Sequence, residues 1–237
     1  MNLSHRSTLT ERMEDPESDS DLVRNSLRQF AVTNRWFCRH RSITDRFLVP
    51  HMLSTGRTSF RVIDVGAGAG DYAMWLCRHL GGRGIRVQIT CLDHDARMVA
   101  YARENCRGNP DIACLEGSAF DLESADVRAD YVVSNHLLHH FDETEVRDFV
   151  HLLNRAPRCG FLCNDLRRSY SSYYWFSVFS AVFLRNSYSR VDGLLSIRKA
   201  FAPSEILQLV RDVADGPGIH VETLAPARLV VHNLGRR

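Results

Sequence analysis

The sequence is poor in lysine, in paired cysteine motifs and in long hydrophobic runs. Only Lys199 among its 30 basic residues is a lysine. The basic residues form no dense run, so the arginine excess indicates coding bias rather than a nucleic-acid surface. The seven cysteines include no C-x-x-C pair and no zinc-ligand spacing. This pattern excludes a zinc ribbon and predicts reduced, mostly buried thiols in a cytoplasmic protein.

Neither an export signal nor a membrane span is visible in the sequence. The first twenty residues are polar and acidic, where a secretory signal needs a basic start followed by an apolar stretch. The longest aromatic and apolar stretch, residues 173–184, is shorter than the roughly 20 residues that cross a bilayer. With 237 residues, of which 44% are hydrophobic and 24% charged, the chain suits one globular domain with a small appendage.

The chain divides into a polar start, a helical segment and a longer alternating region. Residues 1–20 lack apolar periodicity and predict a disordered tail. Residues 21–55 carry apolar side chains at steps of three and four, which indicates one or two amphipathic helices. Residues 56–237 form the main domain, in which short β-branched runs alternate with helical stretches. The predicted strands cover residues 60–66, 86–93, 112–117, 129–135 and 159–165, and the predicted helices cover 71–80, 95–107 and 142–155.

Apolar strands that alternate with helices predict an α/β fold, a doubly wound parallel sheet covered on both faces. After the fifth predicted strand the alternation pauses over residues 170–201, an insertion expected to form a helical cap together with the N-terminal helices. A further helix begins at Pro203. Residues 219–233 contain two apolar runs around a turn at 225–227, which predicts a hairpin at the edge of the sheet.

The strongest chemical signal is a glycine-rich loop, VIDVGAGAGD, at residues 62–71. Gly66, Gly68 and Gly70 let the backbone turn sharply and leave no side chain between the loop amides and a ligand. Asp93 lies 23 residues beyond Gly70, at the end of the second predicted strand, where a carboxylate can accept hydrogen bonds from two ribose hydroxyls. The loop differs from the dinucleotide pattern G-x-G-x-x-G, and it lacks the phosphate-binding lysine of a P-loop.

Four segments together resemble the class I S-adenosylmethionine-dependent methyltransferases, and within them the small-molecule branch that includes quinone-biosynthesis enzymes. They are VIDVGAGAGD (62–71), LDHD (92–95), EGSAFDL (116–122) and YVVSNHLLHHFDE (131–143). The resemblance covers residues 60–165 and implies a Rossmann-like sheet of seven strands with an antiparallel last strand. It also implies S-adenosylmethionine as cofactor. A weaker similarity, in NRWF, NDLRRS and the aromatic run that follows, is to bacterial methyltransferases found beside polyketide synthases that make phenolic lipids.

The resemblance implies a set of cofactor contacts. Asp64 and the glycine loop would face the methionine end, Asp93 would hold the ribose, and His94 would lie against the adenine. The full expected set is Asp64, Gly66, Ala67, Gly68, Gly70, Asp93, His94, Ser118, Ala119, Phe120, Asn135 and His136. Ser118 departs from the family pattern, because many relatives have an acid there that accepts a stronger hydrogen bond from the adenine amine.

Histidines near the end of the fourth strand are candidates for a general base, since histidine titrates near neutral pH. We expect His140, and after it His136, in this role, with packing and capping as the alternative for each. No metal site is expected, because His139 and His140 have no carboxylate partners that the sequence identifies.

Acceptor contacts are expected beyond the carboxyl ends of the strands, where doubly wound sheets bind ligands. The aromatic side chains of the segment after the fifth predicted strand suit a flat or lipophilic acceptor. The alternative role for these side chains is packing in the core. The expected acceptor contacts are Trp36, Asp165, Arg167, Tyr173 and Trp175.

These observations predict methyl transfer from S-adenosylmethionine to a small aromatic or lipophilic acceptor. O-methylation of a phenol is favoured over C- or N-methylation. The expected partner is a small molecule rather than a nucleic acid, because no N-P-P-Y or D-P-P-Y run follows the fourth strand. The sequence is also compatible with a homo-oligomer. Among other classes, a nicotinamide-dependent oxidoreductase is disfavoured because a Tyr-x-x-x-Lys pair is absent, whereas a non-catalytic S-adenosylmethionine-binding module stays open.

Overall fold

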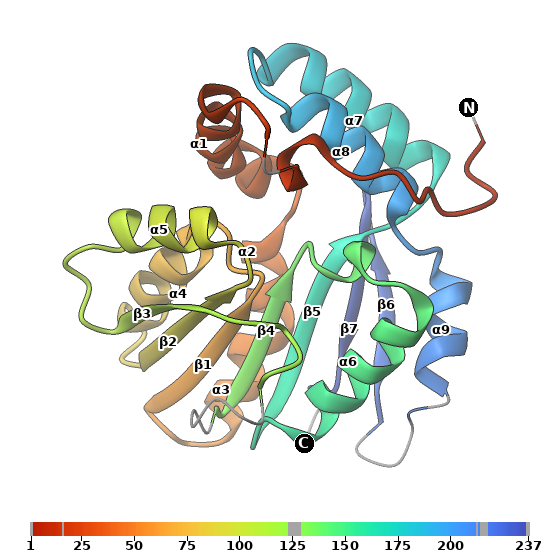
Figure 1. Ribbon diagram of the computed structural model, residues 1–237. Coiled ribbons are helices and arrows are strands. Elements are labelled where there is room, and N and C mark those ends of the chain that lie inside the picture. Colours follow the sequence, from red (N-terminus) through yellow and green to blue (C-terminus); the bar gives the residue numbers. More distant parts are fainter. Residues whose placement is uncertain (1, 16, 123–128, 212, 214–217, 236–237) are drawn as a thin grey trace.

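A seven-stranded sheet with helices on both faces dominates the computed structural model, which describes residues 2–15, 17–122, 129–211, 213 and 218–235 (Figure 1). The strand order is β3-β2-β1-β4-β5-β7-β6. The first five strands are parallel, and β7 is antiparallel to β5 and β6. The strands are β1 (Ser59–Val65), β2 (Arg86–Asp93), β3 (Ile112–Glu116), β4 (Tyr131–Asn135), β5 (Gly160–Leu166), β6 (His220–Leu224) and β7 (Arg228–His232). The predicted doubly wound fold with an antiparallel last strand is confirmed.

Helices pack apolar side chains against each face of this sheet. On one face, α6 and α9 bury residues such as Phe149 and Ile206 against β4 and β5. On the other face, α3 and α4 bury Met52 and Leu76 against β1 and β2. Asp142 begins α6 with a reciprocal capping box, which satisfies two backbone donors that the helix would otherwise leave free. The helices are α3 (Val49–Ser54), α4 (Asp71–Gly81), α5 (Ala96–Asn105), α6 (Glu143–Arg155) and α9 (Pro203–Arg211).

A helical layer lies beyond the carboxyl ends of the parallel strands (Figure 1). It consists of α1 (Ser20–Trp36), α7 (Tyr170–Phe183) and α8 (Ser189–Lys199), and the short helix α2 (His40–Ile43) and the π-helix η2 (Thr44–Leu48) connect α1 to α3. The strand order reverses direction between β1 and β4. A crevice therefore opens at their carboxyl ends, below this layer. None of the described helices is long and apolar enough to cross a membrane.

The N-terminal strap, residues 2–15, crosses α8 and the loop after β4 (Figure 1). Arg6 holds it in place by donating hydrogen bonds to the carbonyls of Lys199 at 2.6 Å, His139 at 3.1 Å and Phe141 at 2.7 Å. Its guanidinium also lies over the ring of Phe201, 3.6 Å from the centroid. These contacts fix the strap to two separate parts of the fold.

Polar side chains of the main domain complete the anchoring of the strap. The buried Arg168 donates to the carbonyl of Leu3 at 2.9 Å. The carboxylate of Asp192 accepts the backbone N–H groups of Arg12 at 2.9 Å and Met13 at 3.0 Å. Composition predicts a disordered tail over residues 1–20, and the contacts that hold residues 2–15 involve partners more than a hundred residues further along the chain.

Candidate functional site

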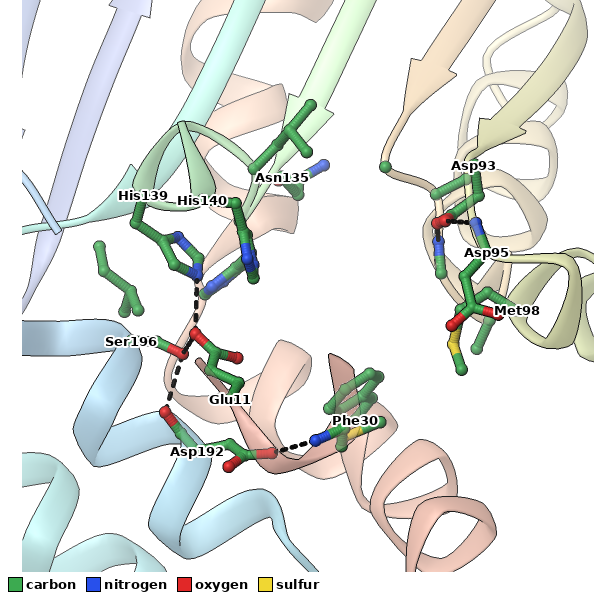
Figure 2. A pocket seen from close by; sticks show the side chains of 18 of the residues that line it. Glu11, Phe30, Asp93, Asp95, Met98, Asn135, His139, His140, Asp192 and Ser196 are labelled. Atoms are coloured by element: carbon green, nitrogen blue, oxygen red, sulfur yellow. Dashed lines mark hydrogen bonds and ion pairs between the residues drawn. The ribbon is translucent and has the colours of Figure 1, made fainter. Parts of the chain in front are cut away.

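A cavity of about 630 Å³ lies at the carboxyl ends of β1, β2 and β4, under α1, α8 and the N-terminal strap. Figure 2 shows Asp93 on one side of it and Asn135 and His139 on the other, with Glu11 from the strap and Phe30 from α1 closing the space. The volume is in the range of small-molecule sites. The expected cofactor residues all line this cavity except Gly70.

The glycine loop forms the floor of the cavity and depends on positive φ angles. Gly66, Gly68 and Gly70 have φ of +69°, +52° and +72°, a region that side chains rarely adopt. Nothing lies within 4 Å of the place where a side chain at Gly68 would begin, so this glycine faces open space. A side chain at Gly70 would begin 2.8 Å from the sulfur of Cys106. Gly68 therefore leaves room for a ligand, whereas Gly70 allows the loop to pack against α5.

Asp93 ends β2 and ties the glycine loop to the start of α5. Its Oδ2 accepts the backbone N–H of Gly68 at 2.9 Å, and its Oδ1 accepts that of Asp95 at 3.1 Å. The exposed His94 follows it, and Ser118 and Phe120 line the same end of the cavity. The structure thus brings together the residues that the resemblance assigns to the ribose and the adenine.

Three buried polar atoms of residues that line the cavity have no hydrogen-bond partner among the described residues. They are Oδ2 of Asp64 and the Nε2 atoms of His40 and His136. Burial and the charges of Asp71 and Asp93 raise the pKa of Asp64 well above its usual range. Burial lowers the pKa of His136 well below its usual value and lowers that of His40 to about 4. Unpaired buried groups are costly, so this part of the cavity is built to receive a polar ligand.

His139 and Asp165 form a hydrogen-bonded pair at the wall of the cavity. The Nδ1 of His139 lies 2.7 Å from Oδ1 of Asp165, whose Oδ2 accepts the backbone N–H of His139 at 3.0 Å. Burial opposes ionisation, but the charge and hydrogen bond of His139 lower the pKa of Asp165. A carboxylate at Nδ1 fixes the tautomer whose Nε2 is free to accept a proton. That Nε2 is 3.8 Å from Glu11 of the strap (Figure 2).

The expected base, His140, lies in a different environment. Its Nδ1 is 2.5 Å from Oε1 of Glu14 and 3.4 Å from the ammonium of Lys199. Burial and the neighbouring His139 lower the pKa of His140. Burial opposes ionisation of Glu14, but His140 and Lys199 bring its pKa to about 2. The geometry therefore favours His139 over His140 as the base, because only His139 is oriented by a buried carboxylate.

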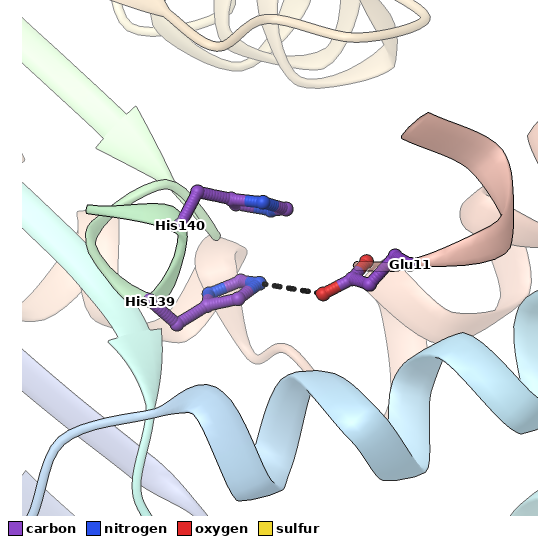
Figure 3. A group of neighbouring side chains, drawn as sticks. All are labelled: Glu11, His139 and His140. Atoms are coloured by element: carbon purple, nitrogen blue, oxygen red, sulfur yellow. Dashed lines mark ion pairs between the residues drawn. The ribbon is translucent and has the colours of Figure 1, made fainter. Parts of the chain in front are cut away.

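Glu11, His139 and His140 offer three potential metal-ligand atoms within 4.8 Å of one another (Figure 3). However, the ammonium of Lys199 lies 3.5 Å from Glu11 and 3.1 Å from Glu14. A positive charge is therefore already held between these carboxylates. We interpret the group as an ion-pair network in which Glu11 and Glu14 join the strap to α8 and to the loop after β4.

Four of the five residues expected to contact the acceptor lie outside the described lining of the cavity. Asp165 lies behind His139, and Arg167 reaches the carbonyl of Pro226 at 3.4 Å. Tyr173 packs against a buried apolar cluster that includes Phe176 and Ile197. Trp175 is 57% exposed. The side chain of Trp36 lies outside the part of the chain that the structure describes.

Three phenylalanines line the cavity where those residues were expected. Phe30 and Phe37 come from α1 and the turn after it, and Phe176 comes from α7. Neighbouring residues on a helix point about 100° apart, so the inward position of Phe176 turns Trp175 away. A run of closely spaced aromatic residues does not by itself indicate which face of the helix is buried, so the sequence does not distinguish Trp175 from Phe176.

Comparison with known proteins agrees with this geometry. Residues 62–160 match the model of a family described as a methyltransferase domain. No curated protein matches the sequence. The solved structure of the plantazolicin methyltransferase BpumL in complex with SAH is similar, with a TM-score of 0.70, 13% identity, and 93% of this chain and 92% of that chain covered.

Two further structures have the same fold. The plantazolicin methyltransferase BamL, in complex with a triazolic desmethylPZN analog and SAH, has a TM-score of 0.63 and 15% identity, with 86% of this chain and 87% of that chain covered. A SAM dependent methyltransferase from Aquifex aeolicus has a TM-score of 0.51 and 17% identity, with 81% and 91% covered. Residues 62–160 therefore match a methyltransferase domain, and the chain shares its fold with these methyltransferase structures.

Proposed function

We propose that the protein transfers the methyl group of S-adenosylmethionine to the hydroxyl of a small, flat aromatic acceptor. The observation that carries this proposal is the pair formed by His139 and Asp165, 2.7 Å apart, at the wall of the cavity. A phenol has a pKa of about 10 and is mostly protonated near neutral pH. A positioned base therefore accelerates methylation of a phenol by removing the proton that its oxygen must lose.

The unpaired polar atoms of the cavity fit the methionine end of the cofactor. Asp64 offers Oδ2 to an ammonium group, and His40 and His136 each offer a ring nitrogen that can donate to a carboxylate. Asp93 would share its carboxylate with the ribose hydroxyls, and Gly68 leaves the space that the ligand needs. When bound, the cofactor supplies an activated methyl group on a sulfonium centre.

The acceptor end of the cavity suits a neutral ring. Phe37 and Phe176 meet edge to face with centroids 5.0 Å apart, and burial of apolar area there contributes about 25 cal/mol per Å². Lysine and arginine are absent from the described residues that line the cavity, whereas Glu11, Glu14 and Asp192 are present. The ammonium of Lys199 is already paired with Glu11 and Glu14, so none of the described lining residues offers an unpaired cation to an anionic acceptor.

In the reaction, the acceptor oxygen forms its bond to the methyl group as the bond from that group to sulfur breaks. The proton of the hydroxyl passes to Nε2 of His139, and Asp165 stabilises the imidazolium that forms. The 3.8 Å between Nε2 of His139 and Oε1 of Glu11 is too long for a hydrogen bond, so Nε2 is left to accept the hydroxyl proton. The strap and α8 keep water away from the reacting groups.

The test is a methylation assay with matched acceptors, in which each phenol is paired with the aniline of the same shape. We expect O-methylated products by mass spectrometry. His139→Gln should abolish most of this turnover while the affinity for S-adenosylmethionine, measured by calorimetry, stays within a factor of a few. Methylation of the anilines alone would reject the hydroxyl acceptor, and cofactor binding without turnover on any acceptor would favour a non-catalytic module.

A further inference from the structure

The outward side of α7 is an unusual surface, because it is apolar, aromatic and free of charge. The helix has 14 residues, none of them charged. Tyr174 is 66% exposed, Trp175 is 57% exposed and Val182 is 58% exposed. We call this surface the outer face of α7. It consists of Tyr170, Tyr174, Trp175, Val178, Val182 and Phe183.

The opposite side of α7 packs against the rest of the protein. Phe176 is buried against Phe37 and Gly193, and Ser172 and Ser180 are fully covered. The outer face therefore adds nothing to the core. A helix at a protein surface normally exposes polar side chains on that side. A contiguous apolar patch on a surface marks a place of interaction.

We propose that the outer face of α7 binds the surface of an anionic lipid bilayer. Tryptophan and tyrosine favour the boundary between lipid and water, since each combines an apolar ring with a polar atom. At about 1.5 Å per residue the helix is roughly 21 Å long, too short for a bilayer core of about 30 Å. It can lie in the plane of the interface but cannot cross it.

Charge near the end of the helix favours the same partner. Arg185 and Arg190 are exposed beside Phe183 and Val191, and neither forms an ion pair with another described residue. Exposed arginines next to an apolar face attract anionic headgroups. A second protein copy would gain from the apolar residues but not from these arginines. Figure 1 shows α7 at the outside of the molecule, where a flat surface can reach it.

The location also relates the membrane to the active site. Phe176 of α7 and Ser196 of α8 line the cavity from the inner side of this helical pair. An acceptor dissolved in lipid would therefore need to pass only this layer to reach the cavity. The inference does not depend on the identity of the acceptor, because vesicle binding is measured without one.

Vesicle sedimentation tests the proposal. The wild-type protein should bind vesicles that contain phosphatidylglycerol and phosphatidylcholine in a one-to-one mixture. It should bind less to vesicles of phosphatidylcholine alone, and less to the mixed vesicles at high salt. Trp175→Ser combined with Phe183→Ser should lower the partition coefficient at least about tenfold. Arg185→Gln should lower it about fivefold on the anionic vesicles only.

Leu53→Ser is the matched control, because Leu53 is 55% exposed on α3, at the other end of the molecule. It should leave the partition coefficient unchanged. The melting temperature and the affinity for S-adenosylmethionine should be unchanged in all variants. This control shows that each variant is folded. Absence of binding by the wild-type protein, or equal binding by the α7 variants, would overturn the proposal. Dimerisation that the α7 variants abolish, without vesicle binding, would assign the face to a second copy.

Discussion

Replacement of Asp165 by asparagine is the sharpest test of the proposed base. Asp165 uses both oxygens on His139, one on the ring at 2.7 Å and one on the backbone N–H at 3.0 Å. Asparagine has nearly the same shape but only one acceptor oxygen. If that oxygen keeps the backbone N–H, the amide NH₂ faces Nδ1. The ring then carries its proton on Nε2 and cannot accept one from the acceptor.

The expected size of the effect follows from the bond that is lost. A hydrogen bond to a charged group contributes about 1.5–3 kcal/mol, which corresponds to roughly 10- to 150-fold in rate. The unfavourable tautomer of His139 adds to this loss. We therefore expect Asp165→Asn to reduce kcat about 10²- to 10⁴-fold on a neutral phenol.

The assay compares two acceptors of similar shape, one with a hydroxyl pKa of about 10 and one acidified to about 7. Turnover of the first should fall steeply in Asp165→Asn, whereas turnover of the second should fall little because its oxygen is already ionised. Calorimetry with S-adenosylmethionine provides the control for folding. Equal losses on both acceptors, or a parallel loss of cofactor affinity, would refute the role of Asp165 and His139 as a base pair.

Three further outcomes test the cofactor site and the buried groups around it. Asp93→Ala should weaken binding of S-adenosylmethionine by about 1–3 kcal/mol in calorimetry, and unchanged affinity would remove Asp93 from the site. Gly70 has φ +72°, and a side chain there would begin 2.8 Å from Cys106, so Gly70→Ala should lower the free energy of unfolding by about 2–4 kcal/mol. Gly56 has φ +70° but no neighbour within 4 Å, so Gly56→Ala should lower the free energy of unfolding by only about 1 kcal/mol. Equal losses would contradict the packing argument. Burial lowers the pKa of His40 from 6.5 to about 4 in the folded protein. As the pH falls, the unfolded chain therefore takes up the proton first. Up to about 3 kcal/mol of stability, which is present above pH 6.5, is lost as the pH falls towards 4. His40→Phe should flatten this dependence in denaturant titrations, and an unchanged slope would assign it to other groups.

Much of the fold is predictable from the sequence because the central strands are buried on both faces. The run at 86–93 coincides with β2, and the helix predicted over 142–155 differs from α6 (Glu143–Arg155) by one residue. Continuous apolar runs and capping residues are local signals, and they survive in the folded protein. The alternation of such runs with helices was sufficient to predict the doubly wound sheet.

The choice between neighbouring histidines was not predictable in the same way. His139 and His140 are adjacent in a single turn of 3₁₀ helix, η3 (Leu138–His140). Only His139 faces the end of β5, where Asp165 lies. The adjacency of the fourth and fifth strands could have indicated this partner, since the carboxyl ends of neighbouring parallel strands meet. Sequence spacing alone does not define the rotation of a short helical turn.

The N-terminal strap bears on the order in which this protein folds. Arg6 bonds to a carbonyl 193 residues ahead in the chain, and the N–H of Arg12 bonds to a carboxylate 180 residues ahead. Contacts over such separations form late, because long loops must close before these contacts stabilise the chain. Glu11 and Glu14 therefore reach His139 and His140 after the sheet and α8 are in place. The segment that precedes α1 therefore completes the cavity last.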